Sequence, residues 1–179
     1  MLFGQVHECW TIFETERLEV REIKESDLPA LFALYEKPGA ADFIEPLFSY
    51  EEELAYTRDY ITKIYGFYGY GMWVIIQKET GNLIGRVGFD DRTTEETGRI
   101  LELGFMIDPD LWRQGYATEA CTASIDYAFT TLDEEVVSCL VHPQNTASKD
   151  FLKTLGFSYR DDVHLSRGDF EWWELFRSK

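Results

Sequence analysis

The stretch Leu101-Glu102-Leu103-Gly104-Phe105-Met106-Ile107-Asp108-Pro109-Asp110-Leu111-Trp112-Arg113-Gln114-Gly115-Tyr116-Ala117-Thr118-Glu119-Ala120 decides the fold of this chain. Its apolar opening predicts a buried strand. Pro109 ends that strand, because proline cannot donate to a sheet ladder and restricts the residue before it. From Ala117 to Phe129, small or apolar residues recur at helical spacing. The stretch therefore predicts a strand, a tight loop and a helix.

A loop of this kind leaves backbone N–H groups without partners at the start of the helix. Those donors and the helix dipole favour a phosphate-like anion. Gly115 allows a ligand to approach the backbone closely, and the small Ala117 keeps the first turn open. The alternative interpretation is an ordinary strand–loop–helix connection that binds no ligand.

The bulk composition fits one soluble domain over residues 1–179, with 45% hydrophobic residues. No apolar run is long enough to span a bilayer. The segment Met1–Glu8 lacks a basic region followed by an apolar core, so no secretory signal is predicted. Cys9, Cys121 and Cys139 show neither metal-ligand nor disulfide spacing. A reducing cytoplasm is the expected location.

The formal net charge of −16 argues against a nucleic-acid binder, which usually carries a basic surface. Acidity favours cationic partners, such as amines or basic protein termini, through long-range attraction. Solubility alone is an equally good explanation of the charge.

The remaining pattern predicts an α+β fold with a mostly antiparallel, mixed seven-stranded sheet and about four helices. Strands are expected at 15–23, 71–78, 83–89, 100–107, 136–141, 157–160 and 170–176, and helices at 27–35, 50–61, 117–129 and 145–155. Ser26, Ser49 and Asn145 are expected to cap helices. Residues 90–98 are expected to form a polar connection, and residues 1–14 an N-terminal extension. The helix between the strands at 100–107 and 136–141 makes these two strands parallel.

Three segments resemble the GCN5-related N-acetyltransferases, in particular the branch that contains the ribosomal-protein N-terminal acetyltransferases. Trp112–Ala120 resembles the acyl-coenzyme A pyrophosphate loop, which usually reads Gln/Arg-x-x-Gly-x-Gly/Ala; Trp112 at its first place is typical of this branch. Thr15–Arg21 resembles the first strand of the branch. Asn145 and Ser148, followed by Leu155-Gly156-Phe157, resemble its Asn-x-x-Ser and Leu-Gly-Phe elements.

The resemblance implies that acetyl-coenzyme A (acetyl-CoA) binds where a bulge splays the parallel strand pair. It implies cofactor contacts from Phe105, Met106, Ile107, Trp112, Arg113, Gln114, Gly115, Tyr116, Ala117, Asn145 and Ser148. It also implies direct attack by an amine in a ternary complex, with no acyl-enzyme and no metal. The exposed or structural histidines form no metal or triad pattern.

Two residues are the expected catalytic groups. Glu102 lies where the branch commonly has a glutamate, and it is predicted to act as the base. The tyrosine that many relatives use as the acid is replaced here by Leu152, so Ser148 is predicted to take the role facing the thiol. The alternatives are a solvated outward position for Glu102, a backbone hydrogen bond for Ser148 and simple helix capping for Asn145. Glu45, Asp90 and Glu95 are secondary candidates for the base.

These features predict an acetyl-CoA-dependent N-acetyltransferase acting on the α-amine of a protein or peptide. A small-molecule amine is the alternative acceptor, and a non-catalytic acyl-CoA-binding regulatory module is the alternative function. A monomer or a homodimer is expected, with aromatic residues around Trp172 and Trp173 as the expected dimer surface.

Overall fold

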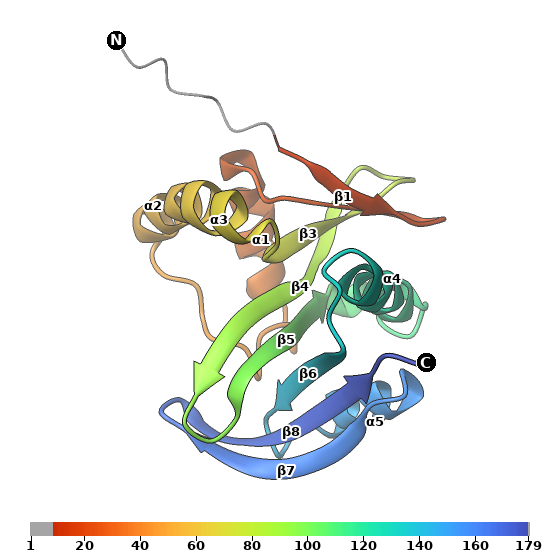
Figure 1. Cartoon of the computed structure of the whole chain (residues 1–179). Coiled ribbons are helices and arrows are strands. Elements are labelled where there is room, and N and C mark those ends of the chain that lie inside the picture. The colour runs from red at the N-terminus through yellow and green to blue at the C-terminus, as the bar shows by residue number, and fades with distance from the viewer. Residues whose placement is uncertain (1–8, 179) are drawn as a thin grey trace.

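The computed structural model describes residues 9–178. Their strands form one mixed sheet in the order β1-β2-β3-β4-β5-β6-β8-β7 (Figure 1). The strands are β1 (Thr11–Glu14), β2 (Leu18–Arg21), β3 (Met72–Gln77), β4 (Leu83–Thr94), β5 (Gly98–Ile107), β6 (Val136–Val141), β7 (Ser158–Leu165) and β8 (Gly168–Phe176). The α-helices are α1 (Leu28–Tyr35), α2 (Tyr50–Tyr60), α3 (Gly66–Tyr68), α4 (Tyr116–Thr130) and α5 (Thr146–Thr154). Shorter helical turns are η1 (Glu25–Asp27), the π-helical η2 (Ile61–Tyr65) and η3 (Pro109–Leu111).

The α+β class and the mixed sheet are confirmed, but the sheet has eight strands where seven were predicted. The additional strand, β1, lies within the predicted extension 1–14 and pairs antiparallel with β2. A four-residue edge strand gives little signal in a sequence. Its Phe13 ring packs edge-on against Trp73, at 6.1 Å between centroids, and this long-range contact holds it in place. The expected absence of a signal in Met1–Glu8 concerns residues outside those the structure describes.

The predicted polar connection at 90–98 is wrong. β4 continues to Thr94, and β5 begins at Gly98. Residues 90–94 are all polar or charged because this end of the hairpin lies near solvent, so the composition of the segment did not indicate a strand. The closing strands β7 and β8 are likewise longer than predicted and form a hairpin that turns between Leu165 and Gly168.

Several local predictions are confirmed. Ser49 precedes α2, and its N–H donates to the Glu52 carboxylate at 3.2 Å. Asn145 caps α5 by accepting from the Ser148 N–H at 3.1 Å. The expected cap at Ser26 is wrong: η1 precedes α1 there, and the Asp27 carboxylate accepts from the Lys24 N–H at 2.7 Å. A carboxylate is the stronger acceptor at this turn.

The two faces of the sheet carry different helices (Figure 1). On one face, the fully buried Trp73 packs against Tyr127 of α4, at 5.4 Å between ring centroids. On the other face, Tyr60 accepts a hydrogen bond from the Met72 N–H at 2.8 Å, and Tyr65 donates to the Met72 carbonyl at 2.6 Å. The segment from α2 to α3 is therefore fixed to the face opposite α4.

The predicted parallel pairing of β5 and β6 is confirmed, and its register consists of the single pair Glu102↔Ser138. By contrast, the β4–β5 register runs without a shift from Gly85↔Ile107 to Thr94↔Gly98. The bulge expected in this region is therefore not part of the β4–β5 pairing. The short parallel contact leaves the β5 segment from Gly104 to Ile107 outside the β5–β6 register.

The predicted exposure of Trp172 and Trp173 is wrong, because these residues are only 7% and 6% exposed. Trp172 donates its indole N–H to the Ser138 hydroxyl at 3.1 Å and packs in a small cluster with Val163 and Leu165. Trp173 belongs to the main core. Within residues 9–178, no helix is both long enough and apolar enough to cross a membrane.

Candidate active site

The loop between β5 and α4 has an open backbone geometry. Gly115 lies in the left-handed region, with φ of +86°, and directly precedes the first residue of α4. Arg113 is also left-handed, with φ of +61°, which is uncommon for a residue with a Cβ. No side chain of the described residues caps the first turn of α4. This exposed turn presents N–H donors and the positive end of a helix dipole to an anion.

Contacts within the chain hold this loop in shape. The Trp112 indole N–H donates to the Ile107 carbonyl at 2.7 Å, and its backbone N–H donates to Pro109 at 3.2 Å. The Gln114 side-chain amide donates to the Asp110 carbonyl at 3.2 Å. Trp112 thus uses both of its N–H groups in hydrogen bonds within the loop. Its role at the expected cofactor site is therefore to stabilise the loop conformation.

A second brace comes from the start of β2. The Arg17 guanidinium donates to the Gln114 carbonyl at 2.9 Å and lies over the Tyr116 ring, 4.2 Å from its centroid. Its Nε also donates to Glu119 in α4 at 2.6 Å. Because Arg17 binds a carbonyl of the loop, that oxygen is turned toward β2.

Three β5 residues are expected to contact the cofactor, and their side chains all pack against other residues of the protein. The Phe105 ring packs on Phe151 of α5 at 5.1 Å. Met106 and Ile107 are each 5% exposed. Their side chains fill the core, so any ligand contact from this segment is made by backbone groups. These backbone groups border the divergence of β5 from β6.

Ser148 lies on the face of α5 that is turned toward β5. Phe151 and Leu152 follow it by three and four residues, and residues at these spacings share a helix face. Leu152 is fully buried and Phe151 contacts Phe105, so this face packs on the sheet. Ser148 itself is half-buried, one turn closer to the helix start. Asn145, the cap of the helix, precedes it.

Glu102 is 9% exposed, and its carboxylate pairs with two guanidinium groups. One oxygen accepts from Arg92 Nε, and Arg167 contacts both oxygens at 3.0 and 3.4 Å. Arg92 lies on β4 and Arg167 in the β7–β8 turn. These ion pairs occupy the carboxylate that the sequence predicts to be the base.

Comparison with known proteins identifies the family of this chain. The family model described as "Acetyltransferase (GNAT) domain" matches residues 17–158. The chain belongs to this GNAT acetyltransferase family. Because it belongs to this family, the chain is an acetyltransferase, and the family uses acetyl-CoA.

The N-acetyltransferase p20 of Bacillus licheniformis, itself uncharacterized, is 32% identical over 148 residues, covering 80% of each chain. A solved acetyltransferase from Agrobacterium tumefaciens is 25% identical, with a TM-score of 0.75, covering 92% of this chain and 94% of that one. The ribosomal-protein-S5-alanine acetyltransferase of Vibrio fischeri shares the fold at 19% identity, with a TM-score of 0.73 and 92% and 95% of the two chains covered.

The acetyltransferase has a wall of aromatic side chains between α1 and β3. Several of them are exposed: Phe43, Phe48, Tyr50, Tyr56, Phe67 and Tyr68. Phe43 reaches across to His142, which follows β6, at 5.2 Å between ring centroids. Tyr65 is not part of this wall, because it is buried and its hydroxyl donates to the Met72 carbonyl at 2.6 Å. The contact of Phe43 with His142 links this wall to the segment that leads into α5.

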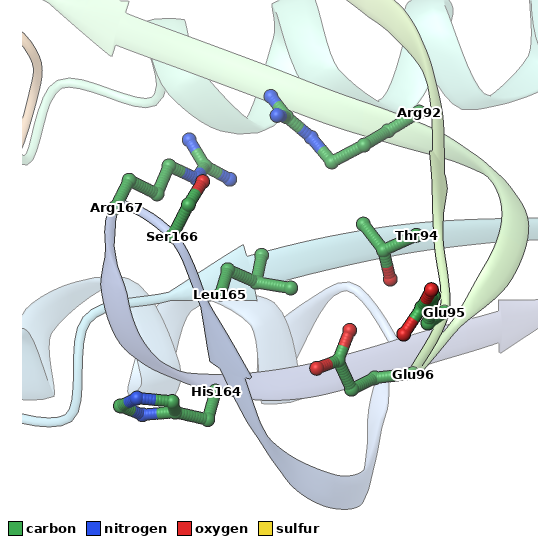
Figure 2. Close-up of a pocket in the computed structure, with 8 residues that line it drawn as sticks. All are labelled: Arg92, Thr94, Glu95, Glu96, His164, Leu165, Ser166 and Arg167. Atoms are coloured by element: carbon green, nitrogen blue, oxygen red, sulfur yellow. The ribbon is translucent and has the colours of Figure 1, made fainter.

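A pocket of about 290 Å³ lies between the tips of two hairpins of this acetyltransferase. Arg92, Thr94, Glu95 and Glu96 line it from the β4–β5 hairpin, and His164, Leu165, Ser166 and Arg167 line it from β7 and its turn. Figure 2 shows Arg92 and Arg167 reaching toward each other from the two hairpins. The same two arginines hold Glu102, so the pocket lies beside the expected catalytic strand.

The two buried cysteines do not supply a nucleophile to this site. Burial raises the pKa of the Cys121 and Cys139 thiols, and Cys139 donates to the Leu103 carbonyl at 3.3 Å. A thiol that stays protonated is a poor nucleophile. Among the described residues, no group of three His, Cys, Asp or Glu side chains is placed to hold a metal ion.

Sequence reasoning missed Arg17, Arg92 and Arg167. Arg17 does stand within the Thr15–Arg21 segment that resembles the family, and its partner Glu119 stands in the loop motif, so a search for paired charges between the motifs would have found them. Nothing in the sequence relates Arg167 to Glu102, which is 65 residues away.

Proposed function

We propose that this acetyltransferase transfers the acetyl group of acetyl-CoA to the α-amine of a protein or peptide, by direct attack in a ternary complex. The observation that carries the proposal is the position of the uncapped, glycine-led start of α4 next to the divergence of β5 from β6. The first feature suits a pyrophosphate and the second suits an extended arm with a thioester. A site with both can hold an acyl-coenzyme.

The contacts that we assign to the coenzyme follow from this arrangement. The backbone N–H groups of Arg113, Gln114, Gly115, Tyr116 and Ala117 bind the pyrophosphate. Backbone groups of Phe105, Met106 and Ile107 bind the pantetheine arm and the oxyanion of the intermediate. Asn145 orients the arm through the start of α5. Ser148 gives a proton to the departing thiolate.

Two features support an α-amine of a peptide or protein as the acceptor. Exposed apolar surface of the kind formed by Phe43, Phe48 and Tyr56 marks interaction sites for larger partners. The net charge of −16 also attracts a cationic chain end. A small amine would need an enclosed pocket and would make little use of an open aromatic wall.

The test uses isotope-labelled acetyl-CoA and the purified protein. Intact proteins, peptides and small amines from a cell extract are incubated separately, and transfer is followed by mass spectrometry. Label on N-terminal α-amines supports the proposal. Label confined to small amines contradicts the acceptor class, and tight coenzyme binding without transfer contradicts catalysis.

A variant that perturbs the proposed pyrophosphate site is Ala117→Glu. Glutamate near a helix start suits the helix dipole, so α4 should stay folded. Its negative charge would repel the pyrophosphate, so binding and transfer should both be lost. If Ala117→Glu keeps its affinity for acetyl-CoA, the coenzyme binds elsewhere.

A further inference from the structure

Asp90 stands directly opposite Glu102 in the β4–β5 pairing. Residues opposite each other in an antiparallel pair share a face and lie about 5 Å apart at Cβ. The two carboxylates are therefore neighbours, although their surroundings differ. Glu102 is held by Arg92 and Arg167. Asp90 is half-buried, and its carboxylate makes no hydrogen bond or ion pair with any side chain or backbone group of residues 9–178.

The next pair on the same face of the sheet is Gly88↔Gly104, two positions along from Asp90 and Glu102. These positions carry no side chain, and the Met72 sulfur lies 3.0 Å from where a Cβ of Gly104 would be. Asp90 and Gly104 are diagonal neighbours, at about 7–8 Å. Gly104 lies beyond the single β5–β6 pair, so Asp90 is close to the start of the divergence of β5 from β6.

Two tyrosines of α2, Tyr56 and Tyr60, lie close enough to Asp90 for its charge to act on them. The pKa of the Tyr56 phenol is raised first by burial and then by the negative charge of Asp90, and the same two causes raise the pKa of Tyr60. Both tyrosines lie on α2, so Asp90 faces the space between the sheet and this helix. Tyr56 is 49% exposed, which keeps this space accessible from solvent.

The charges around Asp90 make it a better proton acceptor than an ordinary aspartate. Burial raises the pKa of the Asp90 carboxyl, and the charge of Glu102 raises it further. The guanidinium groups of Arg92, Arg86 and Arg167 act in the opposite direction, but the pKa stays above its ordinary value. A base works best when its pKa approaches the working pH.

We propose, on the basis of the proposed function, that Asp90 accepts the proton of the attacking amine, and that Glu102 is a positioning residue. The Glu102 carboxylate is held between Arg92 and Arg167, opposite Asp90 in the β4–β5 pairing. The two carboxylates thus have separate tasks: one stays paired and the other takes up the proton.

The ammonium group of the acceptor gives one proton to the Asp90 carboxylate, directly or through water, which frees the nitrogen lone pair. The nitrogen attacks the thioester carbon, a C–N bond forms, and the carbonyl electron pair moves to oxygen. When this pair returns, the C–S bond breaks. The thiolate receives a proton through Ser148, which is restored by the second nitrogen proton, and Asp90 releases its proton to solvent.

The experiment compares Asp90→Asn, Glu102→Gln and Asp91→Asn in the full chain. Asp91 is the matched control, because it is adjacent but bonds to Tyr70 and Arg99. Release of coenzyme A is followed with a thiol-reactive dye, using a library of hexapeptides with free N-termini at low concentration. Under these conditions the initial rate is proportional to kcat/KM. Calorimetric titration of acetyl-CoA and circular dichroism check the cofactor site and the fold.

Asp90→Asn is expected to lower kcat/KM about 100-fold or more and to remove the acidic limb of its pH profile, with the affinity for acetyl-CoA unchanged. Glu102→Gln is expected to keep this limb and shift it to lower pH, since the like charge is gone. Asp91→Asn should leave it unchanged.

An Asp90→Asn variant that stays within threefold of the wild type overturns the assignment of Asp90 and leaves the proposed function standing. A limb that disappears in Glu102→Gln and persists in Asp90→Asn assigns the base to Glu102 instead. If the wild type binds acetyl-CoA but acetylates no peptide or amine, the proposed function fails, and the role of Asp90 fails with it.

Discussion

Replacing Glu119 with glutamine should lower both the stability of the protein and its affinity for acetyl-CoA. The Glu119 carboxylate accepts three hydrogen bonds from the start of β2. Thr15 Oγ1 donates at 2.5 Å, the Arg17 N–H at 2.9 Å and Arg17 Nε at 2.6 Å. These contacts join residues about a hundred positions apart in the sequence, and Arg17 also holds the loop at Gln114.

The expected loss of stability is about 1–2 kcal/mol at pH 7. A hydrogen bond to a charged group contributes roughly 1.5–3 kcal/mol and a neutral one about 1 kcal/mol. Glutamine keeps an acceptor oxygen, so two of the three bonds persist in weaker form. The contribution of the Arg17 guanidinium is reduced because its side chain is 39% exposed. For a chain of this size, the melting temperature should fall by about 2–8 °C.

The pH dependence gives a second test. Burial of the Glu119 carboxyl opposes its ionisation, but the bonds from Thr15 and Arg17 outweigh this and lower its pKa. A carboxyl with a lowered pKa in the folded state stabilises the protein above its unfolded pKa of about 4.3. That stabilisation is lost as the pH falls through the folded pKa. The difference in unfolding free energy between the wild type and Glu119→Gln should therefore be largest at pH 7 and should decrease below about pH 4.

The assay is urea unfolding of both proteins from pH 7 to pH 3.5, together with calorimetric titration of acetyl-CoA at pH 7. Glu16→Gln is the matched control, because Glu16 is exposed at the same turn. If the loss of unfolding free energy in Glu119→Gln does not change with pH, or equals the loss in Glu16→Gln, the Glu119 charge does not stabilise the fold. If Glu119→Gln is less stable but binds acetyl-CoA with unchanged affinity, the contacts of Glu119 with Thr15 and Arg17 stabilise the fold without affecting the cofactor loop.

Three further changes test other parts of the structure. Gly115→Ala should cost about 1–2 kcal/mol, because φ is +86°, and should weaken acetyl-CoA binding several-fold by calorimetry. Gly85→Ala should cost about 3 kcal/mol in urea unfolding, since its Cβ would lie 2.2 Å from the Met106 carbonyl oxygen. Under native conditions at pH 8, a maleimide should label Cys121 and Cys139 at least tenfold more slowly than in urea, as read by peptide mass spectrometry.

Local features could be predicted from the sequence because they depend on contacts between near neighbours. The Asn145 cap lies three residues from the N–H that it accepts. The loop before α4 needs a glycine next to the helix start, and Gly115 marks that place. The parallel pairing of β5 and β6 followed from one helix between two strands. Such signals involve residues that are close in the sequence, so they do not depend on how the rest of the chain packs.

The partners of the charged groups could not be predicted, since they depend on register and packing. Glu102 meets Arg167 only because β7 and β8 form a long hairpin beyond β6. Asp90 stands opposite Glu102 only because β4 continues past the point where its sequence turns polar. A single-residue shift in that register would place the two carboxylates on opposite faces of the sheet.

The sequence by itself therefore determined the acetyltransferase fold and the glycine-containing loop before α4, since both depend on the spacing of residues along the chain. Only the tertiary structure decided which carboxylate is paired and which is left free, that Trp172 and Trp173 are buried, and that β1 joins the sheet. The physical reason is that ion pairs and burial depend on segments far apart in sequence, and these come together only when the sheet forms.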